Sequence, residues 1–334
     1  MAKYEFITKA PRLVQTPFWI FVSSRPRQWL KNFALFAPLV FEGNFFDPLK
    51  FGAVVLGFLI FCMVTSAIYL VNDVIDVEKD RAHPFKSKRP IAAGRVDSQT
   101  AMIAAILMLS AALFFALKIS TFFTIATAAY AILQIFYSLF LRSVILLDVM
   151  AIASGFLLRV FAGAVLIDAH VTIWFILTVA SLALFLAVGK RRSERTLLLG
   201  SGKVMGTRSI LLHYPDSLLD SLTVMFATTC WFSYTMFTFF QPTPQAGPQV
   251  LILFGDLPRT FLASKWLMAT VPFVIYGVMR YLYVIHEKKE GESPERVLLS
   301  DYPLLMTVVI WVIAVFVIIY ASQFLPVKIA RLLR

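Results

Sequence analysis

The chain has 334 residues, of which 59% are hydrophobic and only 15% are charged. A water-soluble domain of this length carries far more charge, so the composition excludes an ordinary globular protein and indicates a polytopic membrane protein. The net charge is +12. On so apolar a chain, basic cytoplasmic loops and anionic lipid headgroups explain this excess better than nucleic acid does. Cys62 and Cys230 lie inside apolar runs and are expected to be reduced thiols that pack in the interior.

Apolar runs long enough to cross a bilayer recur along the whole chain, which predicts an all-α fold with about nine transmembrane helices. No internal repeat or low-complexity segment is present, so we expect a single transmembrane catalytic domain at 18–325. It lies between an N-terminal cytoplasmic segment (1–17) and a basic tail (326–334). The predicted spans are approximately 18–41, 50–71, 98–116, 120–140, 145–166, 171–189, 216–240, 260–284 and 302–325.

The first span is interrupted by Arg25, Arg27 and Lys31, so we expect it to start as an interfacial helix before it enters the membrane. Basic residues then gather in alternate connections, with six each in loops 72–97 and 190–215. The positive-inside rule places these loops and the N-terminus in the cytoplasm. Nine spans leave the basic C-terminal tail on the other side, which is the one charge pattern that disagrees.

Charge concentrates in residues 72–90, which read NDVIDVEKDRAHPFKSKRP. At about 100° per residue, Asp73, Asp76 and Asp80 fall within roughly 60° of one another on a helix, and Asn72 lies beside them. Three aligned carboxylates repel one another unless a cation lies between them. Hard oxygen ligands with open positions suit Mg²⁺ that bridges to a phosphate-bearing substrate. We therefore predict a magnesium site formed by these four residues.

Cations for the phosphate oxygens follow directly in the same loop, at Arg81, Lys86, Lys88 and Arg89. The alternative interpretation is a solvated cytoplasmic loop in which the same charges form intrahelical ion pairs. The one-face spacing of the carboxylates next to a basic cluster favours a binding site.

With the residues that follow it, this stretch (NDVIDVEKDRAHPFKSKRPIAAGRV) resembles the first aspartate-rich motif of the UbiA superfamily of intramembrane prenyltransferases. Four other stretches are similar to its decaprenyl-phosphate phosphoribosyltransferase branch: RPRQWLKN (25–32), 137–164, 174–194 and GESPERVLLSD (291–301). The resemblance spans nearly the whole chain after about residue 20. It implies helices arranged around a central cavity, in a bacterial inner membrane, with the active site facing the cytoplasm.

The resemblance also implies the second half of the site. Where aromatic prenyltransferases of the superfamily carry a second aspartate-rich motif, this chain has Tyr137, Arg142 and a single Asp148. The branch usually has lysine in place of Arg142, and a guanidinium is not interchangeable with an ammonium. Lys31 and Lys190 are phosphate-binding residues by resemblance, whereas composition alone would make them an interfacial anchor and a snorkelling base.

Arg159 shares a helical stripe with Asp148 and Gly155 and lies roughly 16 Å along the helix from Asp148. A charge at that depth costs at least about 2.5–3.5 kcal/mol unless it is paired or wetted, so Arg159 predicts a cavity. The alternative is a structural ion pair between Asp148 and a helix neighbour. Arg280, Tyr281 and the GESPE segment are expected to help cover the cytoplasmic mouth.

The resemblance implies transfer of the 5-phosphoribosyl group from phosphoribosyl diphosphate to a polyprenyl phosphate, in the synthesis of a precursor of lipid-linked arabinose. Asp73 and Asp76, with Asp80 in support, would hold Mg²⁺, and these three with Asp148 would form the catalytic carboxylates. The lipid phosphate would bind Arg142 or Arg159. A homo-oligomer is left open, and no nucleic-acid partner is expected.

Two other functions compete with this one. A UbiA-type aromatic prenyltransferase would use the same acidic motif with an allylic diphosphate donor, but the single aspartate in the second motif favours phosphoribosyl transfer. An anion transporter would be expected to show paired halves, and none are evident. The four histidines make no zinc-binding spacing, and no P-loop is present.

Overall fold

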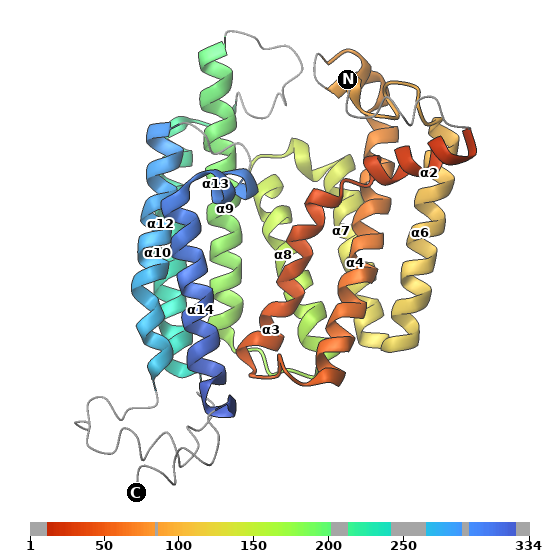
Figure 1. Cartoon of the computed structure of the whole chain (residues 1–334). Helices are drawn as coiled ribbons and strands as arrows, with labels where there is room; N and C mark the ends of the chain where they lie inside the picture. The colour runs from red at the N-terminus through yellow and green to blue at the C-terminus, as the bar shows by residue number, and fades with distance from the viewer. Residues whose placement is uncertain (1–11, 84–85, 202–212, 242–264, 289–293, 325–334) are drawn as a thin grey trace, which may run out of the picture. The chain divides into compact units, whose positions relative to one another are not determined.

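The computed structural model describes residues 12–83, 86–201, 213–241, 265–288 and 294–324, and all the regular elements among them are helical (Figure 1). Seven of these helices are long and apolar enough to cross a membrane, so the chain is an all-α polytopic membrane protein, as predicted. The expected count of nine spans is not reached among the described residues. The predicted span at 216–240 does form a helix, but its many serines and threonines keep it out of the seven.

Residues up to Leu39 and from Asp47 to Ala169 belong to the first of two compact units. Its centre is α4, which packs against η2, α6, α7 and α8. The elements of this unit are α2 (Arg12–Ser23), η2 (Pro26–Leu35), α4 (Pro48–Ile75), α5 (Val77–Arg81), η3 (Lys86–Lys88), α6 (Ser98–Ile119), α7 (Thr121–Leu139), η4 (Leu141–Ser143) and α8 (Leu147–Leu166).

The helix α4 starts where the Asp47 carboxylate accepts hydrogen bonds from the backbone N–H groups of Leu49 and Lys50, and Pro48 occupies its first turn. An N-terminal cap of this kind satisfies donors that the helix leaves without partners. The helix then runs for 28 residues to the acidic stretch. The apolar side chains of α4 are largely buried against the neighbouring helices. This packing holds the charged residues at the C-terminal end of α4 in a fixed position.

A 3₁₀ helix, η2, runs antiparallel to the C-terminal half of α4. Ten residues is long for this type of helix, and polar side chains hold it along its length. The contacts pair successive residues of η2 and its N-cap with residues progressively earlier in α4: Arg25 with Asp73, Gln28 with Tyr69, Trp29 with Ser66, and Asn32 with Thr65 and Cys62.

The C-terminal end of η2 lies directly against α8. A Cβ atom added to Gly163 would collide with the carbonyl oxygen of Leu35, so only glycine permits this approach. Leu35 itself is fully buried. The position of η2 therefore depends on α4 along its side and on α8 at its end.

The predicted first span, 18–41, is divided into three short helices rather than forming one. The α2 helix ends at Ser23, Arg25 takes left-handed backbone angles (φ 53°, ψ 66°), and the chain continues through η2 into α3 (Phe36–Phe41). The hydroxyl of Ser24 donates to the carbonyl of Phe21 at 2.8 Å and helps to end α2. Pro26 lacks a backbone N–H and cannot extend the preceding helix.

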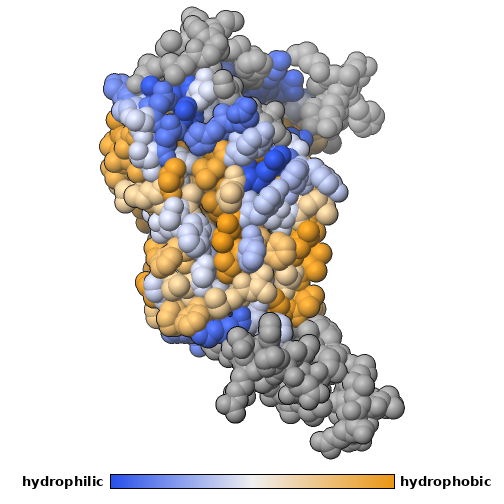
Figure 2. All heavy atoms as spheres, turned by 90° about the vertical axis from the view of Figure 1, so that its left-hand side faces the viewer, coloured by the Kyte–Doolittle hydropathy of each residue, from blue (hydrophilic) through white to orange (hydrophobic). Residues whose placement is uncertain are grey.

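The second unit contains residues 40–46, 170–202 and 210–334. In it, α9 packs against α10, and α12 packs against both α10 and α14. Figure 2 shows mostly apolar side chains across the middle of the face that it presents, with hydrophilic ones gathered at the upper end and a smaller group at the lower edge. Its elements are α9 (Ile173–Ser201), α10 (Asp216–Phe240), η6 (Trp266–Thr270), α12 (Val271–Tyr283), the π-helix η7 (Val284–Lys288), α13 (Pro294–Ser300) and α14 (Tyr302–Phe324).

Several sequence predictions fall on parts of the chain outside the described residues. These are most of the N-terminal segment, the basic tail, the start of the eighth predicted span, Lys203, Arg208 and the first residues of the GESPE segment. The predicted domain boundaries stay predictions. Both cysteines are free and buried, as expected.

Candidate active site

The three motif aspartates, here called the aspartate cluster (Asp73, Asp76 and Asp80), lie where α4 passes into α5. Asp73 is in the last turn of α4, Asp76 is the residue between the two helices, and Asp80 is in α5. Hydrogen bonds from Asp76 N to Asn72 O (3.0 Å) and from Asp80 N to Asp76 O (2.8 Å) keep a near-helical path. Asp73 and Asp80 are each only 3% exposed, whereas Glu78 is exposed.

Two arginines contact the buried carboxylates. The guanidinium of Arg25 donates to Asp73 and lies over the ring of Tyr69 at 4.8 Å. The guanidinium of Arg89 bridges two carboxylates, with contacts of 3.2 Å to Asp73 and 2.5 Å to Asp80. Asp73 and Asp80 are therefore close enough for one cation to serve both.

The third carboxylate has a different partner. Arg142, in η4, donates two parallel hydrogen bonds to Asp76, at 2.8 and 2.9 Å. These bonds hold the pKa of Asp76 below its ordinary value of 3.8 and raise the pKa of Arg142. Such a two-pronged pair needs the planar fork of arginine and is not available to the lysine usual in the branch.

Arg25 is a site residue that the sequence interpretation missed. The sequence marks it as a charge that interrupts a span and as the start of the RPRQWLKN stretch, but assigns it no role in the site. It is 48 positions from Asp73 and contacts it directly. Its left-handed backbone conformation is uncommon for a residue with a Cβ, and such conformations are held in place by surrounding structure. Here the antiparallel contacts of η2 with α4 supply that structure.

The loop after the cluster is anchored to the rest of the first unit. Ile91 and Val96 are buried in a core with Trp19, and the Arg95 guanidinium lies 4.2 Å from the centre of the Trp19 ring. This packing fixes the chain on the C-terminal side of Arg89. A loop held in this way can present its basic residues in a defined arrangement.

The remaining predicted phosphate-binding residues of this loop are more exposed. Arg81 and Lys88 are exposed and Lys86 is half-buried, and Arg81 donates to the carbonyl of Ala92 at 3.4 Å. The charge of Lys86 acts on Asp76, so Lys86 lies within its electrostatic range. Other predicted residues, Asn72, Lys31 and Tyr137, are half-buried in α4, η2 and α7, and Tyr137 is electrostatically coupled to Arg142.

Asp148 and Arg159 are both buried in α8, at 0% and 5% exposure. Asp148 lies in the first turn, where a carboxylate complements the helix dipole. Arg159 donates to three neutral groups, namely Asn32 Oδ1 (2.9 Å), Gly155 O (3.0 Å) and the Tyr130 hydroxyl (2.5 Å). The guanidinium of Arg159 therefore links η2, α7 and α8. The shared helix face of Arg159 and Asp148 did not predict this role.

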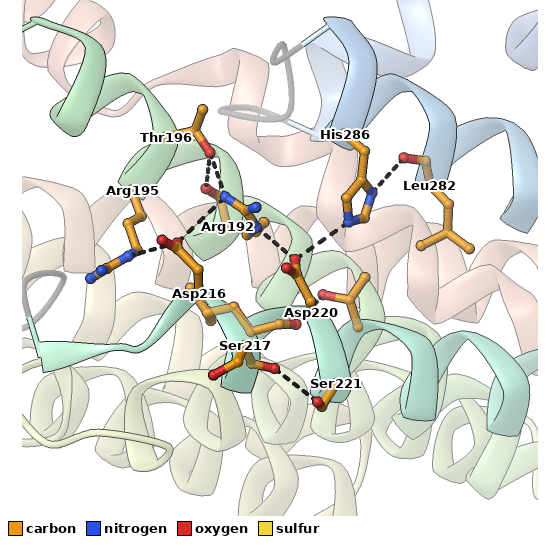
Figure 3. A network of polar contacts seen from close by, with 11 residues as sticks. Arg192, Arg195, Thr196, Asp216, Ser217, Asp220, Ser221, Leu282 and His286 are labelled. Atoms are coloured by element: carbon orange, nitrogen blue, oxygen red, sulfur yellow. Dashed lines mark hydrogen bonds and ion pairs between the residues drawn. The ribbon is translucent and has the colours of Figure 1, made fainter.

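Lys190 belongs to the second unit, on α9. Its Nζ lies 3.8 Å from Glu194 one turn along, and the buried Arg191 contacts the same carboxylate at 2.6 Å. Further along, Arg192 and Arg195 contact Asp216 and Asp220 of α10, and Asp220 also faces His286 (Figure 3). We call Arg192, Arg195, Asp216, Asp220 and His286 the second-unit network.

Two residues expected at a cytoplasmic mouth, Arg280 and Tyr281, both contact other residues of the second unit. Arg280 forms a two-pronged pair with Asp301, at 2.9 and 3.0 Å. Tyr281 is buried against Phe185, with ring centres 5.3 Å apart. These contacts do not test the mouth-covering role, which stays a prediction.

The aspartate cluster has the right chemistry for Mg²⁺, although no group of three or more acidic, histidine or cysteine side chains among the described residues is arranged as a metal site. Mg²⁺ keeps several waters and is usually held by one or two carboxylates together with substrate phosphates. Asp73 and Asp80 converge on one cation, the Arg89 guanidinium, and so could supply the one or two carboxylates that Mg²⁺ needs.

Residues 33–192 match the UbiA prenyltransferase family. The chain is 35% identical over 302 residues to a decaprenyl-phosphate phosphoribosyltransferase of Mycolicibacterium smegmatis, covering 89% of this chain and 91% of the relative. A protein of the same name from Corynebacterium glutamicum is 33% identical, with 89% and 85% covered. A UbiA homolog from Archaeoglobus fulgidus, solved with GPP and Mg²⁺, superposes with a TM-score of 0.65 at 19% identity, over 90% of this chain and 99% of the other.

Proposed function

This chain belongs to the UbiA prenyltransferase family and is a membrane-embedded transferase, and we propose that it moves a 5-phosphoribosyl group from phosphoribosyl diphosphate to a polyprenyl phosphate. The observation that carries the proposal is its similarity, along almost the whole length, to relatives named decaprenyl-phosphate phosphoribosyltransferase. The charged end of α4 supports it, because both substrates carry phosphate groups and the site offers several cations.

The reaction breaks one bond and forms one. The bond between C1 of the ribose and the diphosphate oxygen breaks with its electron pair leaving on diphosphate. An oxygen of the lipid phosphate forms the new bond to C1. Because that phosphate is already ionised, no strong general base is required, and the residues act by positioning and by charge stabilisation.

We assign substrate positioning and charge stabilisation to residues of the first unit according to their exposure and contacts. Arg25 and Arg89, whose side chains are 31% and 28% exposed, would bind the diphosphate oxygens of the donor. Asp73 and Asp80 would hold Mg²⁺, which neutralises the negative charge that develops on the departing diphosphate. Arg142, whose side chain is 26% exposed, would bind the lipid phosphate, because Arg159 is buried among the protein groups that it contacts.

The polyprenyl chain requires a membrane enzyme, and the apolar surface of the seven long helices supplies a suitable environment. The basic residues of the 72–97 loop support a cytoplasmic location for the site, and the bacterial relatives support the inner membrane. Membership of a transferase family disfavours the anion transporter.

The test is a transfer assay with purified protein and Mg²⁺. One mixture contains labelled phosphoribosyl diphosphate and decaprenyl phosphate; the other contains a polyprenyl diphosphate and 4-hydroxybenzoate. We expect labelled phosphoribosyl lipid in the first mixture and no prenylated 4-hydroxybenzoate in the second. Product in the second mixture alone would overturn the proposal in favour of an aromatic prenyltransferase.

A further inference from the structure

The carboxylates and guanidinium groups of the candidate site balance one another. Each member of the aspartate cluster contacts an arginine, and the three arginines involved are Arg25, Arg89 and Arg142. Three negative charges therefore meet three positive charges. With no ligand bound, the site is already neutralised from within.

The two kinds of charge differ in their access to solvent. The side chains of Asp73 and Asp80 are 3% and 5% exposed, whereas those of the three arginines are between 26% and 31% exposed. The carboxylates of Asp73 and Asp80 are thus buried, whereas Asp76, at 21%, is nearly as exposed as Arg142. Part of the surface of each guanidinium group is free for further contacts. Arg89 alone joins two of the carboxylates.

This arrangement penalises either ligand when it binds alone. A divalent cation that takes Asp73 and Asp80 must displace Arg89 and leave a guanidinium without its anion. A phosphate that takes Arg89 must compete with two buried carboxylates, which would then lack a cation. Removing one partner of a buried charge pair is strongly unfavourable because the other charge stays behind.

When both ligands arrive, every charge has a partner again, with the cation on the carboxylates and the phosphate on the guanidinium groups. We propose that the arginines of this site act as internal counter-ions that make the binding of metal and phosphate mutually dependent, with Arg89 as the principal exchanging residue. The inference rests on the proposed function for the identity of the ligands, but concerns their separate binding to the resting protein. Couplings between two ligands typically change affinity by about 5–150-fold.

The proposal predicts gains of affinity on removal of a charged residue. With Mn²⁺ as a paramagnetic probe and no phosphate present, Arg89→Gln should bind the metal about tenfold more tightly than the natural chain. With inorganic diphosphate and a chelator present, Asp80→Asn should bind diphosphate about tenfold more tightly, because Arg89 loses one of its two anions. A residue that merely contacted its own ligand would leave these affinities unchanged, because each experiment omits the ligand that the mutated residue would contact.

Control variants distinguish the exchange of Arg89 for a metal ion from the effect of simply removing one positive charge. Lys79→Gln removes an equal charge from an exposed position of α5 and should alter Mn²⁺ affinity by less than about threefold. If Arg89→Gln does not fold, as judged by size-exclusion chromatography, Arg25→Gln removes the other partner of Asp73 and should change Mn²⁺ affinity in the same direction.

Unchanged or weaker Mn²⁺ binding in the folded arginine variant, or unchanged or weaker diphosphate binding in Asp80→Asn, would overturn the proposal. Neither result depends on turnover. A chain that transfers phosphoribosyl groups but fails these binding tests would contradict the counter-ion inference alone. A chain that passes them but makes no phosphoribosyl lipid would contradict the proposed function alone.

Discussion

Arginine meets aspartate in both units of the molecule, but under different conditions. In the first unit Asp73 and Asp80 are buried beneath their arginines, whereas in the second-unit network Asp216 and Asp220 are 44% and 42% exposed. Exposed ion pairs usually contribute about 0–1 kcal/mol, while breaking a buried pair costs about 3–5 kcal/mol. The contact distances in the two units are alike, so burial of the carboxylates is what separates the aspartate cluster from the second-unit network. Burial alone does not make a site, because Asp301 of the second unit is buried against Arg280 as well.

The largest effect is expected at the aspartate of the cluster whose side chain is least exposed, Asp73. Asp73→Asn keeps the shape of the side chain but removes a charged metal ligand and the anion opposite Arg25 and Arg89. We expect turnover in the phosphoribosyl transfer assay to fall at least about 1000-fold. Asp97→Asn makes the same chemical change at the N-cap of α6 and should retain activity. Normal turnover in Asp73→Asn would remove this aspartate from the site.

A buried arginine with neutral partners tests whether burial matters without an ion pair. Arg159→Gln should lower the free energy of unfolding by about 1–3 kcal/mol, because Asn32 and Tyr130 lose a charged donor. Thermal unfolding in detergent measures this loss, and Tyr130→Phe, which removes one acceptor, should cost less. The KM for polyprenyl phosphate should change by less than about twofold. A large rise in KM in a stable variant would restore Arg159 as a phosphate ligand.

The pair between Asp76 and Arg142 is of intermediate burial, and its effect should depend on pH. The pKa of Asp76 in the folded chain is below its ordinary value of 3.8. Near pH 3.8 the folded chain therefore binds fewer protons at Asp76 than the unfolded chain does. The pair therefore stabilises the fold above about pH 4 and loses this contribution as the pH falls through the folded pKa. Unfolding temperatures of the natural chain and Arg142→Gln should differ at pH 6 and converge toward pH 3. A constant difference over that range would contradict the assignment.

The smallest effect is expected in the second-unit network. Asp220→Asn removes contacts with Arg192 and His286, yet should change the free energy of unfolding by less than about 0.5 kcal/mol, since both sides are reached by water. Phosphoribosyl transfer should stay near the natural rate. A loss comparable with that of Asp73→Asn would show that exposure does not separate the two regions.

The helical membrane fold was predictable from the sequence because apolar length alone decides whether a helix can span a bilayer. The aspartate cluster was predictable because helix geometry relates residues three to seven positions apart. The predicted convergence is seen for Asp73 and Asp80, which share Arg89, while Asp76 contacts a separate arginine. The interruption between α4 and α5 falls at Asp76, a detail that spacing does not reveal.

The rest of the candidate site depends on contacts between distant segments. Nothing in the residues around Arg25 indicates that its backbone turns left-handed and directs the side chain to Asp73. The partners of Arg159 likewise come from η2 and α7, 127 and 29 positions away. A signal was present for Arg25, because Arg-Pro followed by Trp and Asn interrupts an otherwise apolar span, but its meaning required the tertiary fold.

The close packing of Gly163 on Leu35 has a consequence for the chemistry some distance away. Any side chain at position 163 would push the backbone of η2 outward, and the polar contacts along α4 would transmit that shift toward Arg25. A residue that carries no functional group can thus determine how an aspartate at the other end of the bundle is neutralised. Gly163→Ala should behave as an active-site variant although it touches no substrate.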